Sequence, residues 1–335
     1  MKRCLLNALV LILAALPGWA QSRKVVVSGM GDAAVAQLQQ AAPGLRIVAA
    51  PDRASLLREV AEAEAVFGTI DPELIAAGGK LKWVQVFSAG VERFVGPELA
   101  KSSITLTNCK IIQGPNIADH AFALLLTLTR QTRRAVLDTV AAEWSRGDYR
   151  MIELNGKTAV IIGVGGIGMQ IAQRAHGFGM KVIGVDPKDI PYSPLLAKVV
   201  PPDRLDTVLP EADVVFVAAP LTRESQGMVG PRQFDLMKKG AYFIAVSRGR
   251  LYSKEGLIRA LDSRHLAGAG LDVTDPEPLP QDDPLWKFDN VVITPHIAGQ
   301  SDQVQQRRMD LLQENLRRFA KGEPLLNVVD VNKGY

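Results

Sequence analysis

The chain has 335 residues, of which 47% are hydrophobic and 22% are charged, and this is enough apolar material for about two globular domains. Lys and Arg outnumber Asp and Glu by 39 − 35 = 4, and the extra positive charges are not clustered along the sequence. Because a nucleic-acid-binding surface requires a concentrated basic stripe, we expect no nucleic-acid partner.

The N-terminus has the order of a secretory signal. A basic start precedes an apolar run from Leu5 to Leu16, and small residues occur at positions 18 and 20. This order predicts a signal peptide at residues 1–20, and the apolar run is too short for a stable membrane span. We expect an exported or periplasmic protein if the signal is used, and a cytoplasmic one if the segment is an extension or a misplaced start. Cleavage would leave Cys109 as the one cysteine, which excludes an internal disulfide.

The residues that follow alternate short apolar segments with amphipathic ones, which is typical of the strands and helices of a parallel sheet. Strands are expected at residues 24–28, 46–49, 65–68 and 83–87, and helices at 32–41, 53–63 and 71–77. Asp32 is expected to cap the first of these helices. A longer helix is predicted from near Asn116 toward Trp144, and its apolar composition indicates burial between domains or subunits.

The alternation resumes after this long helix and continues toward the C-terminus. Strands are expected at residues 158–163, 181–186, 214–219, 242–246, 267–273 and 291–294, and a final helix at 301–320. Six strands is the number in a complete dinucleotide-binding sheet. The predicted fold class is therefore α/β, with two Rossmann-like domains whose parallel sheets carry helices on both faces.

A glycine-rich turn ends the first strand of this second series, in the segment TAVIIGVGGIG. In a dinucleotide-binding turn, the first glycine permits the sharp bend, the second lets the backbone approach a pyrophosphate, and the third lets the helix pack on the strand. The helix N-terminus would offer its free N–H groups to the phosphates. The residues predicted to bind a cofactor in this way are Gly163, Gly165, Gly166, Ile167 and Gly168.

An acidic residue ends the next expected strand. Asp186 lies 18 residues beyond Gly168, close to the usual spacing of an acid that binds the adenosine ribose. A carboxylate there would repel the 2′-phosphate of NADP(H), so NAD(H) is the expected cofactor, although Lys188 weakens this preference over NADP(H). The alternatives are a packing turn without a nucleotide and a site for another adenosyl ligand, as in a methyltransferase.

Three polar segments follow later strands of the second series, at the strand ends where ligands bind in such sheets. Arg248 offers a planar, bidentate cation to a carboxylate, and His296 can give a proton to a carbonyl oxygen as it is reduced. Glu277 can orient the imidazole and stabilise its protonated form. Each residue taken singly could be a solvated charge or a loop histidine, but together they predict hydride chemistry on a keto acid. The histidines expected to be structural are His120, His176 and His265.

Over residues 24–330 the sequence closely resembles the D-isomer-specific 2-hydroxyacid dehydrogenase family. The matching segments are SAGVERF (88–94), NIADHAFALLLTLTR (116–130), GVGGIG with Asp186, VSRGR (246–250), GLDVTDPEPLP (270–280), DPLW (283–286) and NVVITPHIAG (290–299). The resemblance implies a discontinuous, flavodoxin-like substrate domain at residues 24–118 and 299–335, with an NAD-binding Rossmann domain at 119–298 inserted between its two parts. It also implies a homodimer formed through the helix near 116–146.

The resemblance also implies roles for individual residues. Arg248 would bind the substrate, His296 would be the catalytic acid and base, and Glu277 would be the acid paired with it. The backbone amides of the loop at Ala89 and Gly90 would hold the substrate carboxylate, and the side chain of Asp272 would lie near the nicotinamide ring.

These observations predict an oxidoreductase that transfers a hydride between NAD(H) and a small 2-hydroxy acid or 2-keto acid, as glyoxylate and hydroxypyruvate reductases do. Metal ligands are not expected. Two departures from the family, Ala245 where Asn is frequent and Ser253 where Asp is frequent, bear on substrate preference and rate. The alternative is a nicotinamide-binding sensor or corepressor-like protein on the same fold. Free nicotinamide cofactor is scarce outside the cytoplasm, which conflicts with export, although an exported enzyme could carry its cofactor out tightly bound.

Overall fold

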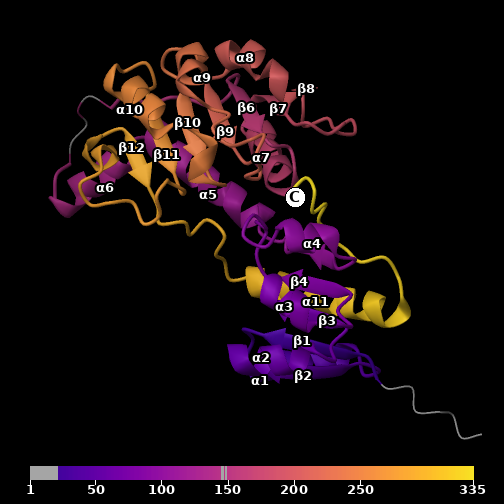
Figure 1. Ribbon diagram of the computed structural model, residues 1–335. Coiled ribbons are helices and arrows are strands. Elements are labelled where there is room, and N and C mark those ends of the chain that lie inside the picture. The colour runs from indigo at the N-terminus through magenta and orange to yellow at the C-terminus, as the bar shows by residue number, and fades with distance from the viewer. Residues whose placement is uncertain (1–21, 145–146, 148) are drawn as a thin grey trace, which may run out of the picture.

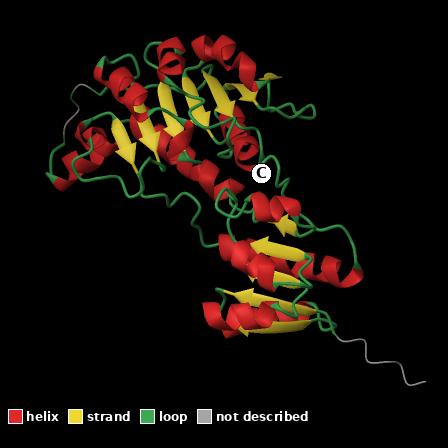
Figure 2. Ribbon diagram, in the orientation of Figure 1, coloured by secondary structure: helices red, strands yellow, loops and turns green. Residues whose placement is uncertain are grey.

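The computed structural model describes residues 22–144, 147 and 149–335, so the predicted signal peptide lies outside the described residues. Figure 1 shows two α/β lobes joined end to end, with the C-terminus beside the region where they meet. Helices flank the strands in both lobes (Figure 2). Each lobe is built on one sheet, and every strand pairing within the two sheets is parallel.

The lobe that begins the described chain contains a five-stranded sheet of order β2-β1-β3-β4-β5. Its strands are β1 (Lys24–Ser28), β2 (Arg46–Ala50), β3 (Ala65–Gly68), β4 (Trp83–Val86) and β5 (Thr105–Thr107). Its helices are α1 (Asp32–Ala41), α2 (Arg53–Val60), α3 (Pro72–Ala77), α4 (Pro97–Lys101) and the C-terminal α11 (Val304–Lys321). Because α11 packs against α1, the end of the chain returns to the first sheet.

The other lobe contains a seven-stranded sheet of order β12-β11-β10-β9-β6-β7-β8. Its strands are β6 (Thr158–Ile162), β7 (Lys181–Val185), β8 (Lys198–Val200), β9 (Val214–Val217), β10 (Tyr242–Ala245), β11 (Gly268–Leu271) and β12 (Val291–Ile293). Its helices are α5 (Gly114–Thr129), α6 (Thr132–Val140), α7 (Gly166–Gly177), α8 (Leu205–Val208), α9 (Pro231–Leu236) and α10 (Lys254–Asp262). The order reverses beside β6, so the glycine turn after β6 lies where such sheets bind ligands.

The central strand β9 shows why this sheet is covered on both faces. Val215 and Val217 belong to one apolar cluster, whereas Val214 and Phe216 belong to the cluster on the opposite face. Successive strand residues point to opposite faces, so a strand between two helix layers needs an apolar residue at every position. The predicted α/β class, with parallel sheets and helices on both faces, is confirmed.

The prediction of one long helix from Asn116 toward Trp144 is wrong. The chain forms α5 and α6 instead, and Gln131 between them adopts a left-handed conformation with φ 52°. This conformation ends the ladder of helical hydrogen bonds and redirects the chain. The apolar α5 is largely buried, whereas α6 has no buried residue. Among the described residues, no helix is both long and apolar enough to cross a membrane.

Smaller differences concern caps and edge strands. Gly31, and not Asp32, is the N-cap of α1, and no side chain caps this helix, because Asp32 already lies in its first turn. The helix expected at 53–63 ends at Val60. The edge strands β5 and β8 were not expected, because three residues are too few to establish a period of two. With β8 the second sheet has seven strands where six were expected.

Candidate active site

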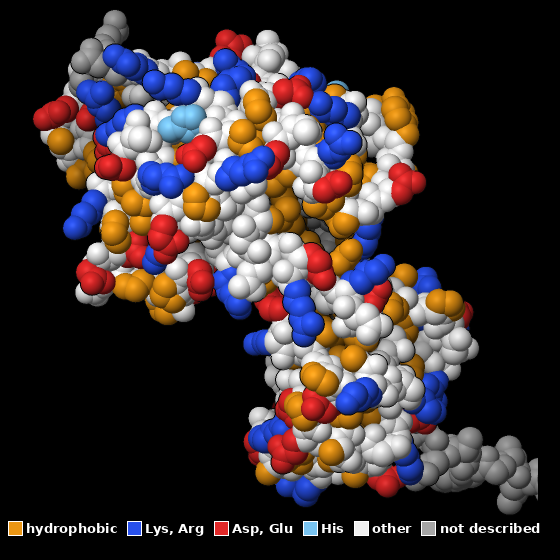
Figure 3. Space-filling model, turned by 45° about the horizontal axis from the view of Figure 1, so that its top comes forward, with side chains coloured by type: hydrophobic (Ala, Val, Ile, Leu, Met, Phe, Trp, Pro, Cys, Tyr) orange, Lys and Arg blue, Asp and Glu red, His pale blue; other side chains and the backbone are white. Residues whose placement is uncertain are grey.

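A cavity of about 900 Å³ lies between the two lobes, whose narrow junction is visible in Figure 3. Its walls come from the loop after β4, the start of α5, the glycine turn after β6 and the loops after β10, β11 and β12. In parallel α/β sheets, ligands bind outside the carboxyl ends of the strands, and these loops follow such ends. Eight of the predicted site residues line this cleft: Ala89, Gly90, Gly165, Gly166, Ile167, Arg248, Asp272 and His296.

The glycine turn has the geometry that a pyrophosphate requires. Gly163 has φ +91°, and a Cβ there would lie 2.5 Å from the backbone nitrogen of Ala219. A Cβ on Gly168 would collide with the carbonyl oxygen of Gly163. Gly165 is the N-cap of α7, lacks a side-chain cap, and would meet nothing within 4 Å if a Cβ were added. The turn is therefore tightly packed beneath and open on the cleft side, where helix N–H groups can receive an anion.

Asp186 lies directly beside this turn. Its Oδ2 accepts a hydrogen bond from the backbone N–H of Val164 at 2.8 Å, and its Oδ1 accepts one from the N–H of Lys188 at 2.9 Å. The carboxylate lines a neighbouring cavity of about 520 Å³, which shares Lys188 with the cleft. The residues present thus fit a dinucleotide, with phosphates at the glycine turn and a ribose near Asp186.

The structure brings the predicted acid–base pair together. Nδ1 of His296 lies 2.8 Å from Oε2 of Glu277. The other carboxylate oxygen of Glu277 accepts a hydrogen bond from the backbone N–H of Thr274 at 3.1 Å, which holds the carboxylate in place. His296 lines the cleft and Glu277 does not, so the imidazole nitrogen that is not paired with Glu277 is the one available to a molecule in the cavity.

Asp272 organises the loop that carries the histidine. It is 1% exposed, and its carboxylate accepts hydrogen bonds from the hydroxyl of Thr294 and the N–H groups of Ile297 and Ala298 at 2.6–3.0 Å. His296 has φ 53°, and its N–H donates to the backbone oxygen of Asp272 at 2.9 Å. The left-handed conformation of a non-glycine residue is costly, and these bonds hold it in place.

Another histidine contributes to the same network. Nε2 of His120, on α5, lies 2.8 Å from Oγ1 of Thr294 and 3.5 Å from Oδ1 of Asp272. His265 is instead hydrogen-bonded to the carbonyl oxygen of Met237 at 2.8 Å. His120 therefore supports the loop that presents His296, a position that its place within an apolar helix did not indicate.

The loop at Ala89 and Gly90 meets Arg248 across the cleft. The Nδ2 group of Asn108 donates to the carbonyl oxygen of Ala89 at 2.7 Å, and Ser88 Oγ donates to that of Gly90 at 2.6 Å. A Cβ on Gly90 would collide with the guanidinium of Arg248. A carboxylate bound between this loop and Arg248 would therefore contact both lobes.

Sequence reasoning missed Glu92, which belongs to the same loop. Its Oε1 accepts a hydrogen bond from Nε of Arg248 at 2.7 Å, and the pair connects the two lobes. Partial burial favours the neutral acid, but the hydrogen bond and the charge of Arg248 outweigh it and lower the pKa of Glu92 below its ordinary value. Glu92 lies within the segment SAGVERF, but a single acidic residue there has no distinguishing pattern.

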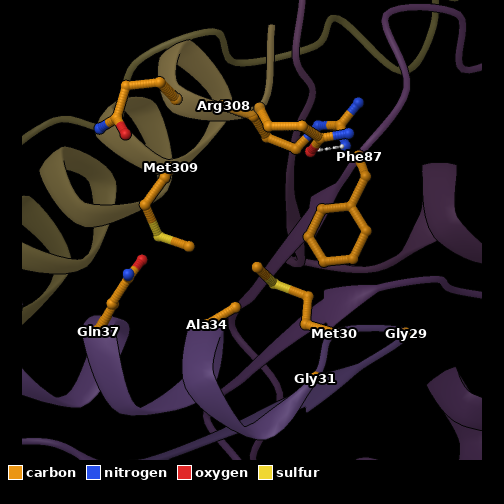
Figure 4. Close-up of a pocket in the computed structure, with 10 residues that line it drawn as sticks. Gly29, Met30, Gly31, Ala34, Gln37, Phe87, Arg308 and Met309 are labelled. Carbon is orange, nitrogen blue, oxygen red and sulfur yellow. Dashed lines mark hydrogen bonds between the residues drawn. The ribbon is translucent and has the colours of Figure 1, made fainter. Parts of the chain in front are cut away.

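A smaller cavity, of about 450 Å³, lies between α1 and α11 (Figure 4). Met30, Met309 and Phe87 give it apolar walls, and Arg308 lies at its edge toward the cleft. No predicted site residue lines it, so the interdomain cleft is the candidate active site. Within the described parts of the chain, no group of three or more His, Cys, Asp or Glu side chains could hold a metal ion.

Comparisons with known proteins identify the family of the chain. The family model "D-isomer specific 2-hydroxyacid dehydrogenase, NAD binding domain" matches residues 122–298. A glyoxylate reductase of Korarchaeum cryptofilum is 34% identical over 292 residues, which are 84% of this chain and 87% of the relative. A D-isomer specific 2-hydroxyacid dehydrogenase family protein from Aeromonas salmonicida superposes with a TM-score of 0.79 at 31% identity, over 92% of this chain and 99% of that one. An NADPH-dependent glyoxylate/hydroxypyruvate reductase from Sinorhizobium meliloti, solved with NADP and sulfate, gives a TM-score of 0.79 at 26% identity, covering 93% of this chain and 100% of that one.

The fold and the site define a two-lobed dehydrogenase with a nicotinamide cofactor, and the chain belongs to the D-isomer specific 2-hydroxyacid dehydrogenase family. It is an oxidoreductase that transfers a hydride between a nicotinamide cofactor and a 2-hydroxy acid or 2-keto acid. The resemblance seen in the sequence is thereby confirmed.

Proposed function

We propose that the protein is an NAD(H)-dependent reductase of small 2-keto acids such as glyoxylate and hydroxypyruvate. The observation that carries this proposal is the 2.8 Å pair of His296 and Glu277, on the same cleft as Arg248 and the glycine turn. A sensor of nicotinamide cofactors would need no proton donor at this position. Relatives named glyoxylate reductase support the choice of substrate.

Substrate binding is assigned to Arg248 and to the backbone of Ala89 and Gly90. A planar guanidinium binds a carboxylate through paired, charge-assisted hydrogen bonds, and the adjacent loop can add neutral N–H donors. These groups belong to different lobes, so a bound keto acid would bring the lobes together and exclude water.

Proton transfer is assigned to His296. A bound nicotinamide supplies the hydride to the keto carbon, and the negative charge that develops on the carbonyl oxygen requires a proton at the same moment. The nitrogen of His296 that faces the cleft donates this proton, and the carboxylate of Glu277 stabilises the protonated imidazole. Asp272 contributes by holding the loop that carries the histidine, next to the place of the nicotinamide.

Cofactor binding is assigned to the glycine turn and to Asp186. Gly163 and Gly168 shape the turn, and Gly165, Gly166 and Ile167 would face the pyrophosphate. The carboxylate of Asp186 would accept hydrogen bonds from the ribose and repel a 2′-phosphate, which favours NAD(H) over the NADP found with the Sinorhizobium meliloti relative.

Further assignments concern the assembly and location of the protein. We propose the domain boundaries expected from the sequence, with residues 24–118 and 299–335 as the substrate domain and 119–298 as the NAD-binding domain, so that the first boundary falls within α5, the helix that connects the two lobes. A homodimer is proposed through α6, which exposes Val136, Leu137 and Val140 by 59–81%. Export through a signal at residues 1–20 remains part of the proposal.

The assay that tests this function follows NADH absorbance with glyoxylate, hydroxypyruvate and pyruvate, and repeats each reaction with NADPH. Arg248→Ala should raise KM for the keto acid roughly 100-fold, because it removes the cation that binds the carboxylate. Arg264→Ala is the matched control, since Arg264 is exposed and pairs with Asp289 at 3.1 Å. Absence of turnover with every acid, or an unchanged KM in Arg248→Ala, would overturn the assignment.

A further inference from the structure

Arg248 is already paired with a carboxylate of the opposite lobe, that of Glu92. Its Nε donates to Oε1 of Glu92 at 2.7 Å, and its Nη1 donates to the backbone oxygen of Ser247, also at 2.7 Å. A guanidinium offers five N–H donors in a plane, so these two contacts leave part of its edge free. Arg248 and Glu92 both line the cleft, and their side chains are 29% and 37% exposed.

The Arg248–Glu92 pair lies against the loop that is proposed to hold the substrate carboxylate. A Cβ built on Gly90 would collide with Nη2 of Arg248 and would lie 2.6 Å from Oε2 of Glu92. The guanidinium of Arg248 and the carboxylate of Glu92 thus both lie close to the Cα of Gly90. A ligand carboxylate that binds Arg248 beside this loop must therefore come within a few ångströms of a fixed negative charge.

Glu92 remains ionised in neutral solution. The Arg248 guanidinium keeps the pKa of this carboxyl below its ordinary value despite partial burial. Four other cationic side chains line the cleft, those of Arg93, Lys110, Lys188 and Arg308. Lys110 Nζ donates to the carbonyl oxygen of Val328 at 3.0 Å and Arg308 Nη1 donates to Oε1 of Gln305 at 2.9 Å, whereas Glu92 is hydrogen-bonded to Arg248. The charge of Glu92 therefore offsets that of Arg248 where the substrate binds.

We propose that Glu92 determines substrate specificity by restricting the site to acids with a single negative charge. The inference rests on the proposed function, in which Arg248 binds the substrate carboxylate. One carboxylate can share the guanidinium with Glu92, whereas a second anionic group on the same small molecule would be repelled by it. Placing a like charge in the site is an established way to reject a competing ligand.

The test compares oxamate with oxalate, which have nearly the same size and differ by one negative charge. Their inhibition constants are measured against glyoxylate with NADH, and the readout is the ratio of the oxalate constant to the oxamate constant. Glu92→Gln should lower this ratio at least about tenfold, because it removes one repulsive charge within several ångströms. Glu92→Asp should keep the ratio within about threefold of the wild-type value.

Control variants separate the effect of removing the Glu92 charge from structural effects of the substitution. Glu98→Gln removes an exposed carboxylate from α4 and should leave the ratio unchanged. If Glu92→Gln does not fold, Glu92→Ala replaces it, and if a folded variant does not turn over, calorimetric dissociation constants on the NADH-bound protein give the same ratio. A ratio that stays within twofold of wild type in the folded charge-removal variant overturns the proposal.

The same measurements separate failure of the Glu92 inference from failure of the proposed function. If the wild-type protein reduces no keto acid, or if Arg248→Ala binds oxamate as tightly as wild type, the function itself is wrong. If wild type is active, Arg248→Ala loses oxamate binding, and the ratio still does not respond to Glu92, the inference alone is wrong.

Discussion

His296 and Glu277 form a hydrogen bond of 2.8 Å between Nδ1 and Oε2, and the two side chains are 44% and 38% exposed. The carboxylate is held from behind by the N–H of Thr274. A fixed carboxylate acceptor on Nδ1 leaves the second ring nitrogen as the one that can take up and give a proton in the cleft, which is what a general acid and base requires.

Replacement of this histidine should remove proton donation without removing substrate binding. We expect His296→Asn to lower kcat roughly 100-fold or more, in line with the usual contribution of general acid–base catalysis, and to change KM much less. Steady-state kinetics with NADH and glyoxylate measures both constants. His176→Asn, on the exposed end of α7, is the control and should behave as wild type. Near-normal turnover in His296→Asn would contradict the assignment.

Asp186 should control the choice between the two nicotinamide cofactors. Asp186→Asn keeps an acceptor for the N–H of Val164 but removes the charge, so it should raise the NADPH:NADH ratio of kcat/KM about tenfold. Asp189→Asn, an exposed neighbour, serves as the control. An unchanged ratio in Asp186→Asn would show that this carboxylate does not face the ribose.

Much of the site could be predicted because its residues follow strands. Parallel strands bring their carboxyl ends to one edge, so Arg248, Glu277 and His296, which follow different strands, were expected to converge there. Glu92 could not be found in this way, since it lies 156 residues from Arg248 and belongs to the other lobe. Their contact depends on how the lobes meet, which no local pattern encodes.

Much of the fold could also be predicted from the sequence. Buried apolar strands such as β1 and β3 were predicted with their observed bounds, because several buried residues in succession give a clear signal. The break between α5 and α6 was missed, since a left-handed conformation at Gln131 has no signature in a residue other than Gly or Asn.

The exposed apolar face of α6 should be covered by a second copy of the chain. Val140 is 81% exposed, and a charge buried there without a partner would be costly, so Val140→Glu should weaken self-association about 100-fold. Sedimentation velocity at micromolar concentration measures the effect. Val328→Glu, at a 46% exposed position outside α6, is the control. A wild-type monomer, or a Val140→Glu protein that stays dimeric, would contradict the proposed dimer.

Cys109 should be unreactive in the folded protein. Burial raises the pKa of its thiol from 9.0 to about 11, and the nearby charge of Arg308 only partly opposes this. The thiolate is the reactive form, so at pH 8 only about a thousandth of the folded thiol is available, and reactivity should rise as the pH approaches 11. In a Cys4→Ser background, labelling with a chromogenic disulfide should be at least about 100-fold slower in native than in guanidinium-unfolded protein. Equal rates would show that Cys109 is accessible.

Isotope labelling can follow the hydride from the cofactor to the substrate. NADH carrying deuterium at one of the two C4 positions is oxidised in the presence of glyoxylate, and the glycolate formed is examined by mass spectrometry. We expect one deuterium at C2 of glycolate from only one of the two labelled forms, at a rate that His296→Asn reduces. Glycolate without deuterium from either form, or no glycolate at all, would contradict it.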